Sequence, residues 1–136
     1  MDDQLEETGR DVNAIDEHEE TALHIAAKED FLEAAEWLIN HWADKEATNT
    51  HGRTPLHFAA DHDSVKVARL LIDHGANVNA RGLFMWTPLY LAAKKNSLQV
   101  AKLLIENGAD KNIRTRYGRR RPIDFARSSE MKALLQ

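Results

Sequence analysis

The chain has 136 residues and a formal net charge of −4; 43% of its residues are hydrophobic, 29% are charged and none is cysteine. This length and composition predict one ordered globular domain and exclude disulfide frameworks and thiolate metal sites. No apolar run is long enough to cross a bilayer, and the opening residues are acidic where a secretory signal would be basic and then apolar. We therefore expect an intracellular protein, cytoplasmic or nuclear, without membrane contact.

Charge is distributed unevenly along the chain. Residues 1–44 hold fourteen acidic and two basic residues, whereas residues 111–136 hold eight basic and two acidic residues. We expect residues 1–11 to form an acidic N-terminal segment ahead of the main domain, either partly disordered or with a partial helix that begins at Leu5. The opposite charges of the two ends also predict salt-sensitive head-to-tail self-association.

Three copies of one pattern follow in register. Thr21, Thr54 and Thr87 are 33 residues apart and begin the strings TALHIAAKED, TPLHFAADHD and TPLYLAAKKN. The strings FLEAAEWLINHWAD, SVKVARLLIDHGAN and SLQVAKLLIENGAD come next in each copy, and a shorter copy, GRRRPIDFARSSEMKALLQ, ends the chain. A fixed period of this length predicts a stack of repeated structural units.

Each copy predicts two short helices. Thr54 before Pro55 is typical of a helix start, and Gly75 is typical of the end of the second helix. Each helix has one apolar stripe, formed in the second copy by Leu56, Ala59 and Ala60 and then by Val65, Ala68, Leu71 and Ile72. Because neither helix could bury its stripe alone, we expect the copies to stack into one continuous core.

The strings GRTPLHFAA at 52–60 and VARLLIDHGANVNA at 67–80, with their counterparts, resemble the ankyrin repeat over residues 12–136. The resemblance implies an all-α solenoid of helix-turn-helix units with projecting β-hairpin-like loops, its repeats at about 12–44, 45–77, 78–110 and 111–136. It also implies a scaffold that binds another protein through its loop tips and concave face. We find no catalytic constellation, so we predict a protein that is not an enzyme and needs no cofactor.

The histidines favour structural roles. His24 and His57 match the histidine of the family motif, which is expected to hydrogen-bond neighbouring loops. No two histidines have the i, i+4 spacing of a helical metal pair, so we predict no metal site. Three departures from the motif concern glycine: Trp42, Glu19 and Met85 stand where other copies have it. At Trp42 and Met85 the positive-φ turn is predicted to be strained or rebuilt, with Gly82 as a substitute hinge.

The resemblance also implies a set of partner-contacting positions on the tips and on the exposed sides of the first helices. In the third repeat and the cap they are Arg81, Leu83, Phe84, Met85, Trp86, Lys94, Lys95, Arg114, Arg116, Tyr117 and Arg119. In the first two repeats they are Glu17, His18, Glu20, Lys28, Glu29, Thr50, His51, Arg53, Asp61 and His62.

The string GLFMW at 82–86 places large apolar side chains on a loop tip, where no core should need them. They either pack internally against the neighbouring tip, form a contact between copies of the chain, or form the centre of an interface with a partner. We favour the partner interface, because burying each such side chain is worth roughly 1.5 to 3 kcal/mol.

The last loop is basic, with six basic residues between Lys111 and Arg121. This cluster is either a solvated cap loop or a site for an acidic protein, a nuclear import receptor or nucleic acid. Nucleic acid is the weakest of these, because the protein as a whole is negatively charged and its acidic half would repel phosphate.

One modification is implied by the resemblance. Asn79, in LLIDHGANVNA, resembles the ankyrin loop asparagines that eukaryotic asparaginyl hydroxylases modify. The alternative, which we favour, is that this asparagine caps its loop by hydrogen bonding.

Overall fold

The computed structural model describes residues 11–136, which form seven α-helices, three short 3-10 helices and no strand. All but the last residue of the expected acidic segment, 1–11, lie outside this range. The elements in chain order are η1 (Asp11–Asn13), α2 (Ala22–Glu29), α3 (Leu32–Asn40), α4 (Pro55–His62), α5 (Val65–Asp73), η2 (Leu83–Met85), α6 (Pro88–Lys95), α7 (Leu98–Glu106), η3 (Pro122–Phe125) and α8 (Ser129–Leu135).

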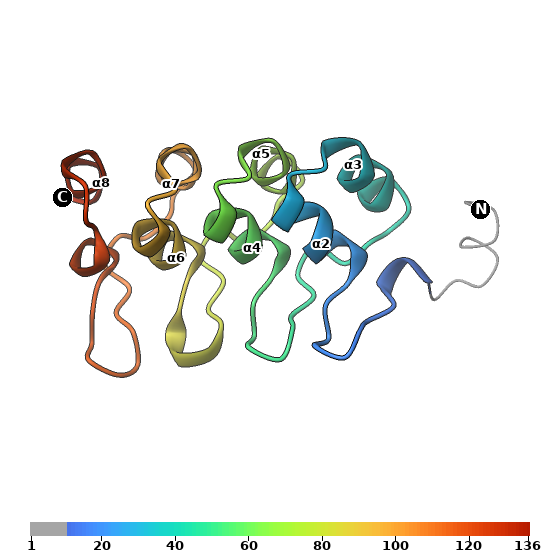
Figure 1. Ribbon diagram of the computed structural model, residues 1–136, viewed down its shortest axis with the longest axis horizontal. Coiled ribbons are helices and arrows are strands. Elements are labelled where there is room, and N and C mark those ends of the chain that lie inside the picture. Colours follow the sequence, from blue (N-terminus) through green and yellow to red (C-terminus); the bar gives the residue numbers. More distant parts are fainter. Residues whose placement is uncertain (1–10) are drawn as a thin grey trace.

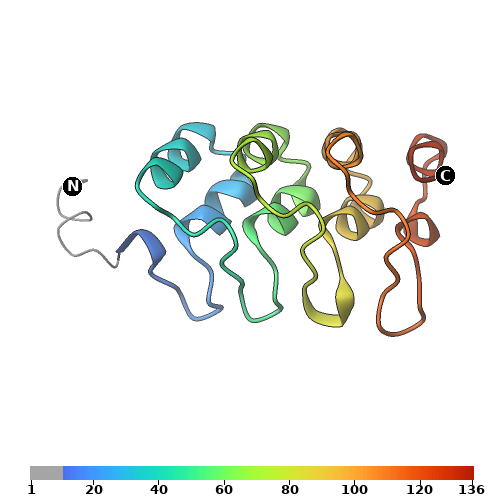
Figure 2. The ribbon, with the colours of Figure 1, turned by 180° about the vertical axis from the view of Figure 1, so that it is seen from behind.

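The helices stand in two parallel rows, and the loops project from one side of the stack (Figure 1). The first row is α2, α4, α6 and η3, each packed against the next, and the second row is α3, α5, α7 and α8. The view from behind shows the same order, with the four loops side by side (Figure 2). The expected all-α helix-turn-helix solenoid is confirmed, while the four repeat boundaries stay a prediction.

The first helix of each full repeat begins at its threonine. The hydroxyl oxygens of Thr21, Thr54 and Thr87 each accept a hydrogen bond of 3.3 Å from the backbone N–H three residues later. Each of these helices ends at an aspartate or asparagine in the left-handed conformation. The capping threonine satisfies a backbone donor that the helix itself leaves unpaired, which fixes where the helix starts.

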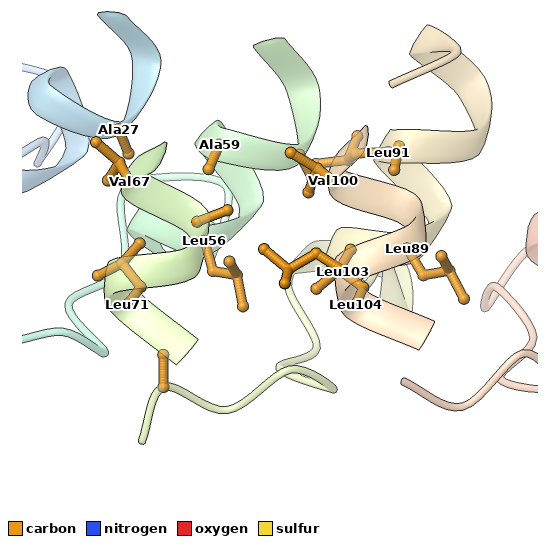
Figure 3. Close-up of a cluster of buried hydrophobic side chains, with 14 of the residues drawn as sticks. Ala27, Leu56, Ala59, Val67, Leu71, Leu89, Leu91, Val100, Leu103 and Leu104 are labelled. Atoms are coloured by element: carbon orange, nitrogen blue, oxygen red, sulfur yellow. The ribbon is translucent and has the colours of Figure 1, made fainter. Parts of the chain in front are cut away.

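The core runs as one layer between the two rows of helices (Figure 3). The predicted residues Leu56, Ala59, Ala60, Ala68 and Leu71 are all buried within it. The prediction missed one residue of α5 and overrated two others: Val67 is fully buried, whereas Val65 and Ile72 are only half-buried. Because α5 packs against α3, α4 and α7 at once, its buried face is rotated about the helix axis relative to the apolar stripe that the sequence predicts.

Side chains at the ends of the first helices tie each repeat to the next. A carboxylate oxygen of Asp30 accepts the backbone N–H of Val67 at 2.9 Å, and Asp63 accepts that of Val100 at the same distance. In the third repeat the amide oxygen of Asn96 accepts the hydroxyl of Ser128 at 2.8 Å. These bonds fix how far one helix pair can shift against its neighbour.

Two buried histidines join the helices to the loops, as expected from the family motif. Nδ1 of His57 accepts the backbone N–H of Thr54 at 3.0 Å, so Nε2 carries the proton and donates to the carbonyl of Trp86 at 2.8 Å. His24 makes the same pair of bonds one repeat earlier, to Thr21 and to the carbonyl of Arg53. Each histidine therefore connects its own helix start to the loop of the following repeat.

The expected hinge at Gly82 is wrong. Gly82 has a φ of −87°, whereas Met85 and Trp42 keep the left-handed turn at 67° and 68° although they are not glycine. Gly82 is instead required by a close approach, because a Cβ there would lie 2.9 Å from the carbonyl oxygen of Gly52. The turns at Met85 and Trp42 are therefore kept, at a cost of about 1 to 2 kcal/mol each.

Acid should destabilise the fold through the buried histidines. Burial lowers the pKa of His57 to about 4 and also lowers the pKa of His24. The unfolded chain then binds protons more readily than the folded chain between about pH 6.5 and pH 4. His57 contributes its full stability above about pH 6.5 and loses roughly 2 kcal/mol of it by about pH 5.

Urea unfolding of the wild type and of His57→Gln, at neutral pH and at about pH 5, measures this loss. We expect a smaller difference between the two pH values in the variant. Equal differences in both proteins would contradict the role of His57.

Candidate protein-interaction surface

Backbone hydrogen bonds link the loop tips in a row. Each tip donates one N–H to a carbonyl of the tip before it: Thr50 to His18 at 3.1 Å, Leu83 to His51 at 2.9 Å, and Arg116 to Phe84 at 2.8 Å. The donors are 33 residues apart, so the repeat period itself sets this row of bonds. The third tip is therefore held on both sides, by the second and by the last.

The third tip differs from the second in how it closes. In the second tip, the side-chain oxygen of Asn49 accepts the backbone N–H groups of His51 and Arg53, both at 2.9 Å. Gly82 takes the place of Asn49 and has no side chain to do this. Both tips share one pair of backbone bonds, which in the third tip run from Gly82 to Trp86 at 2.8 Å and from Met85 to Gly82 at 3.1 Å. In the third tip the 3-10 turn η2 adds a bond from the N–H of Trp86 to the carbonyl of Leu83 at 3.3 Å. The η2 turn is visible near the end of the third loop (Figures 1 and 2).

Aromatic rings continue from this tip into the stack. We call the five rings the aromatic strip: Tyr117, Phe84, Trp86, Tyr90 and Phe125. Their consecutive centroids are separated by 5.3, 6.5, 4.4 and 4.5 Å in that order. The strip joins the tips of the third and last repeats to the first-row elements α6 and η3. Contacts of this kind add about 0.5 to 1.5 kcal/mol per pair beyond the area buried.

The apolar group at 83–86 is divided between packing and exposure. Trp86 and Met85 are half-buried, and Trp86 packs on Tyr90 of its own repeat. The ring of Phe84 contacts Tyr117 of the neighbouring tip, as the internal interpretation expects. Leu83 is 47% exposed, Phe84 41% and Tyr117 67%. The strip is therefore anchored at its inner end and open to solvent at its outer end.

Cations lie over the rings of the strip. Arg53 and Lys94 lie 5.4 and 5.1 Å from the centroid of the Trp86 ring. Arg116 and Arg120 lie 5.8 Å from Tyr117 and from Phe125. The strip therefore carries a positive charge at each of its two ends and at its centre.

A shallow groove lies beside the strip, between the first two repeats. It has a volume of about 280 Å³ and is lined by Glu20, Lys28, Asn49, His51, Arg53, Phe58, Asp61 and His62. Within it Asp61 is paired with Lys95 at 3.6 Å and with His62 at 3.3 Å. The groove thus brings together six of the predicted contact residues, and Arg53 connects it to the strip.

Three predicted basic residues stand apart from the rings. Arg81 and Arg119 are exposed, and Arg114 donates a hydrogen bond of 2.9 Å to the carbonyl of Arg119. Sequence reasoning missed Tyr90 and Phe125 as rings of the strip, and it missed Arg120 as a cation over Phe125. The signal for Tyr90 was its position, because it replaces the histidine of the other repeats and so places a ring beneath Trp86.

Asn79 links its loop to the following repeat by hydrogen bonds. Its side-chain oxygen accepts the backbone N–H of Asp110 at 2.7 Å, and its amide nitrogen donates to the carbonyl of Gly108 at 3.2 Å. The expected hydrogen-bonding role is therefore confirmed, but the bonds join two repeats instead of closing the loop of Asn79 itself. Hydroxylation of Asn79 stays a prediction.

Within residues 11–136, no group of three histidine, aspartate or glutamate side chains could hold a metal ion. No helix in that range is long and apolar enough to cross a membrane. The candidate site consists of exposed aromatic rings, the cations that lie over them and a shallow groove.

The stacked helix pairs and linked tips define a repeat solenoid, and comparison with known families specifies which kind. A family model for ankyrin repeats in three copies matches residues 3–82, and a second, for many copies, matches residues 71–126. The chain belongs to the ankyrin repeat family. Domains of this family generally mediate protein–protein interaction and are typically not catalytic. A search among curated proteins finds no match.

Proposed function

We propose that this protein binds another protein through its loop tips and concave face, with Leu83 and Phe84 at the centre of the contact and without catalysis of its own. The observation that carries the proposal is the exposed outer end of the aromatic strip. We place this binding inside the cell, in the cytoplasm or nucleus.

The energetics of the tip support an interface. Covering the exposed parts of Leu83 and Phe84 would recover part of the roughly 1.5 to 3 kcal/mol that full burial of such a side chain is worth. Binding energy in protein interfaces is concentrated in a few central residues, among which aromatic residues and arginine are enriched. Leu83 and Phe84 have this position, with arginines on either side.

The rigidity of the tip lowers the cost of binding. Backbone bonds hold Leu83 to His51 and Phe84 to Arg116, so the two side chains are already placed before a partner arrives. A preorganised surface loses less conformational entropy on binding than a mobile loop does. The groove with His51, Asp61 and His62 would then contact the partner beside this centre.

A second candidate function is binding of nucleic acid or of another acidic surface through the C-terminal arginines. The exposed side chains of Arg114, Arg116 and Arg119 favour it. Its nucleic-acid form is weaker, because the protein carries a net negative charge.

Removing the exposed side chains should remove the interface. We expect the double variant Leu83→Ser, Phe84→Ser to bind its partner about 10 to 100 times more weakly, since two central residues are lost. Affinity capture from cell lysate with wild type and variant identifies the partner, and titration of that purified partner gives the two dissociation constants.

The matched control is Phe31→Ser, Trp42→Ser. These two side chains are also large, apolar and exposed, but they flank α3 rather than a loop tip. The control should keep wild-type affinity. If both double variants bind every partner as the wild type does while keeping its helical content, the proposed interface is wrong.

Self-association is a second way to cover the strip. The first tip carries the exposed Ile15 beside Glu17 and Glu19, so it offers an apolar side chain among acidic groups. Docking of this tip on the strip of a second copy would be head-to-tail and would not close into a dimer.

Light scattering across protein concentrations tests this association. Head-to-tail contacts predict a molar mass that rises with concentration at low salt and returns to the monomer value at high salt. A monomer at all concentrations in low salt would rule the association out.

A further inference from the structure

The cations of the strip have no carboxylate partners among the described residues. Salt bridges in residues 11–136 join His18 to Glu17 and join His62 and Lys95 to Asp61. None of them involves Arg53, Lys94 or Arg116. The strip thus presents positive charge that the described part of the chain does not neutralise.

Two acidic groups near the strip are already engaged, and a third, Glu20, lines the groove together with Arg53. Asp61 pairs with Lys95 and His62, and a carboxylate oxygen of Asp124 accepts the backbone N–H of Arg121 at 2.8 Å. Residues 78–136 contain twelve basic residues against four acidic ones. The excess charge therefore extends well beyond the strip itself.

A cation over a ring is a prepared site for a carboxylate. Its side chain is held by the ring, so less conformational entropy remains to be lost when an anion binds. Lys94 and Arg53 are half-buried, which weakens screening by salt water around them. The ring of Phe84 lies between Trp86, which these cations cover, and Tyr117, which Arg116 covers, and Leu83 precedes it in the chain.

We propose that the segment that docks on this strip is an acidic stretch of the partner protein carrying two adjacent large apolar side chains. These side chains cover Leu83 and Phe84, and carboxylates on either side of them meet Lys94 and Arg53 over Trp86 and Arg116 over Tyr117. This inference rests on the proposed function and specifies the chemistry of the partner.

A nucleic acid fits the same surface less well. Single-stranded nucleic acids bind aromatic surfaces by stacking their bases on open ring faces. Arg53 and Lys94 already lie over Trp86, and Arg116 lies over Tyr117, so cations take positions that bases would need. A carboxylate, in contrast, needs access only to the cations and not to a ring face.

Fluorescence anisotropy with labelled short probes tests the proposal. The probes are an acidic peptide with a central Leu-Phe, the same peptide with Gly-Ser at its centre, a basic and an uncharged peptide with Leu-Phe, and a single-stranded oligothymidylate. We expect the acidic Leu-Phe peptide to bind at least about tenfold more tightly than each other probe.

Charge reversal on the strip supplies the second measurement. Lys94→Glu, Arg116→Glu should weaken binding of the acidic Leu-Phe peptide by about tenfold or more. The matched control is Arg69→Glu, Lys102→Glu, which changes the same two residue types and the same net charge at exposed positions of α5 and α7. The control should keep most of the wild-type affinity.

Each other outcome overturns the proposal. Equal loss in both charge variants would mean that the overall charge attracts the peptide, and stronger binding of oligothymidylate would assign the surface to nucleic acid. Equal binding of the basic or uncharged Leu-Phe peptide, lost in Leu83→Ser, Phe84→Ser, would leave the proposed function standing and refute only the acidic partner. Absence of binding by every probe would refute the acidic segment, and the lysate capture would then decide the interface separately.

Discussion

Burial of apolar surface between neighbouring repeats holds this structure together, because no helix pair can bury its apolar face alone. Three sets of hydrogen bonds between repeats recur along the stack. Asp30 and Asp63 tie the ends of first-row helices to the second-row helix of the next repeat, His24 and His57 tie helices to loops, and the backbone N–H of Leu83 ties one tip to the next. The position of every tip is thus determined by its neighbours more than by its own sequence.

This support explains how the third tip tolerates an unusual sequence. Phe84 and Met85 both have positive φ, at 61° and 67°, a conformation that costs side-chain-bearing residues on the order of 1 to 3 kcal/mol each. Bonds to the second and last tips offset this cost. The turn keeps this strain and still leaves Leu83 and Phe84 exposed, which supports a role in binding.

Much of the fold could be predicted from the sequence, because each repeat carries its own signals for a helix start and a buried face. Thr54, Pro55 and the spacing of Leu56, Ala59 and Ala60 are enough to place a helix and its buried face. Burial of Val67 could not be predicted from one stripe, since it depends on three neighbouring helices. The role of Gly82 also required coordinates, because only the approach of the Gly52 carbonyl shows why a side chain is excluded.

The candidate site was predictable in its position and not in its structure. GLFMW departs from the repeat pattern, and that departure marks the third tip. The sequence left open whether these side chains pack or bind, and the structure divides them, with Trp86 against Tyr90 and with Leu83 exposed. The cations over Trp86 come from two different repeats, so no local pattern could indicate them.

The central claim is that neighbouring repeats hold the third tip in place before any partner binds. Amide hydrogen exchange of the free protein, resolved by residue, tests it most directly at the N–H groups of Leu83 and Arg116. The account predicts that both exchange much more slowly than they would in an unstructured chain. Exchange of both at the unstructured rate would mean that the tips are not linked, and a preformed binding surface would then be contradicted.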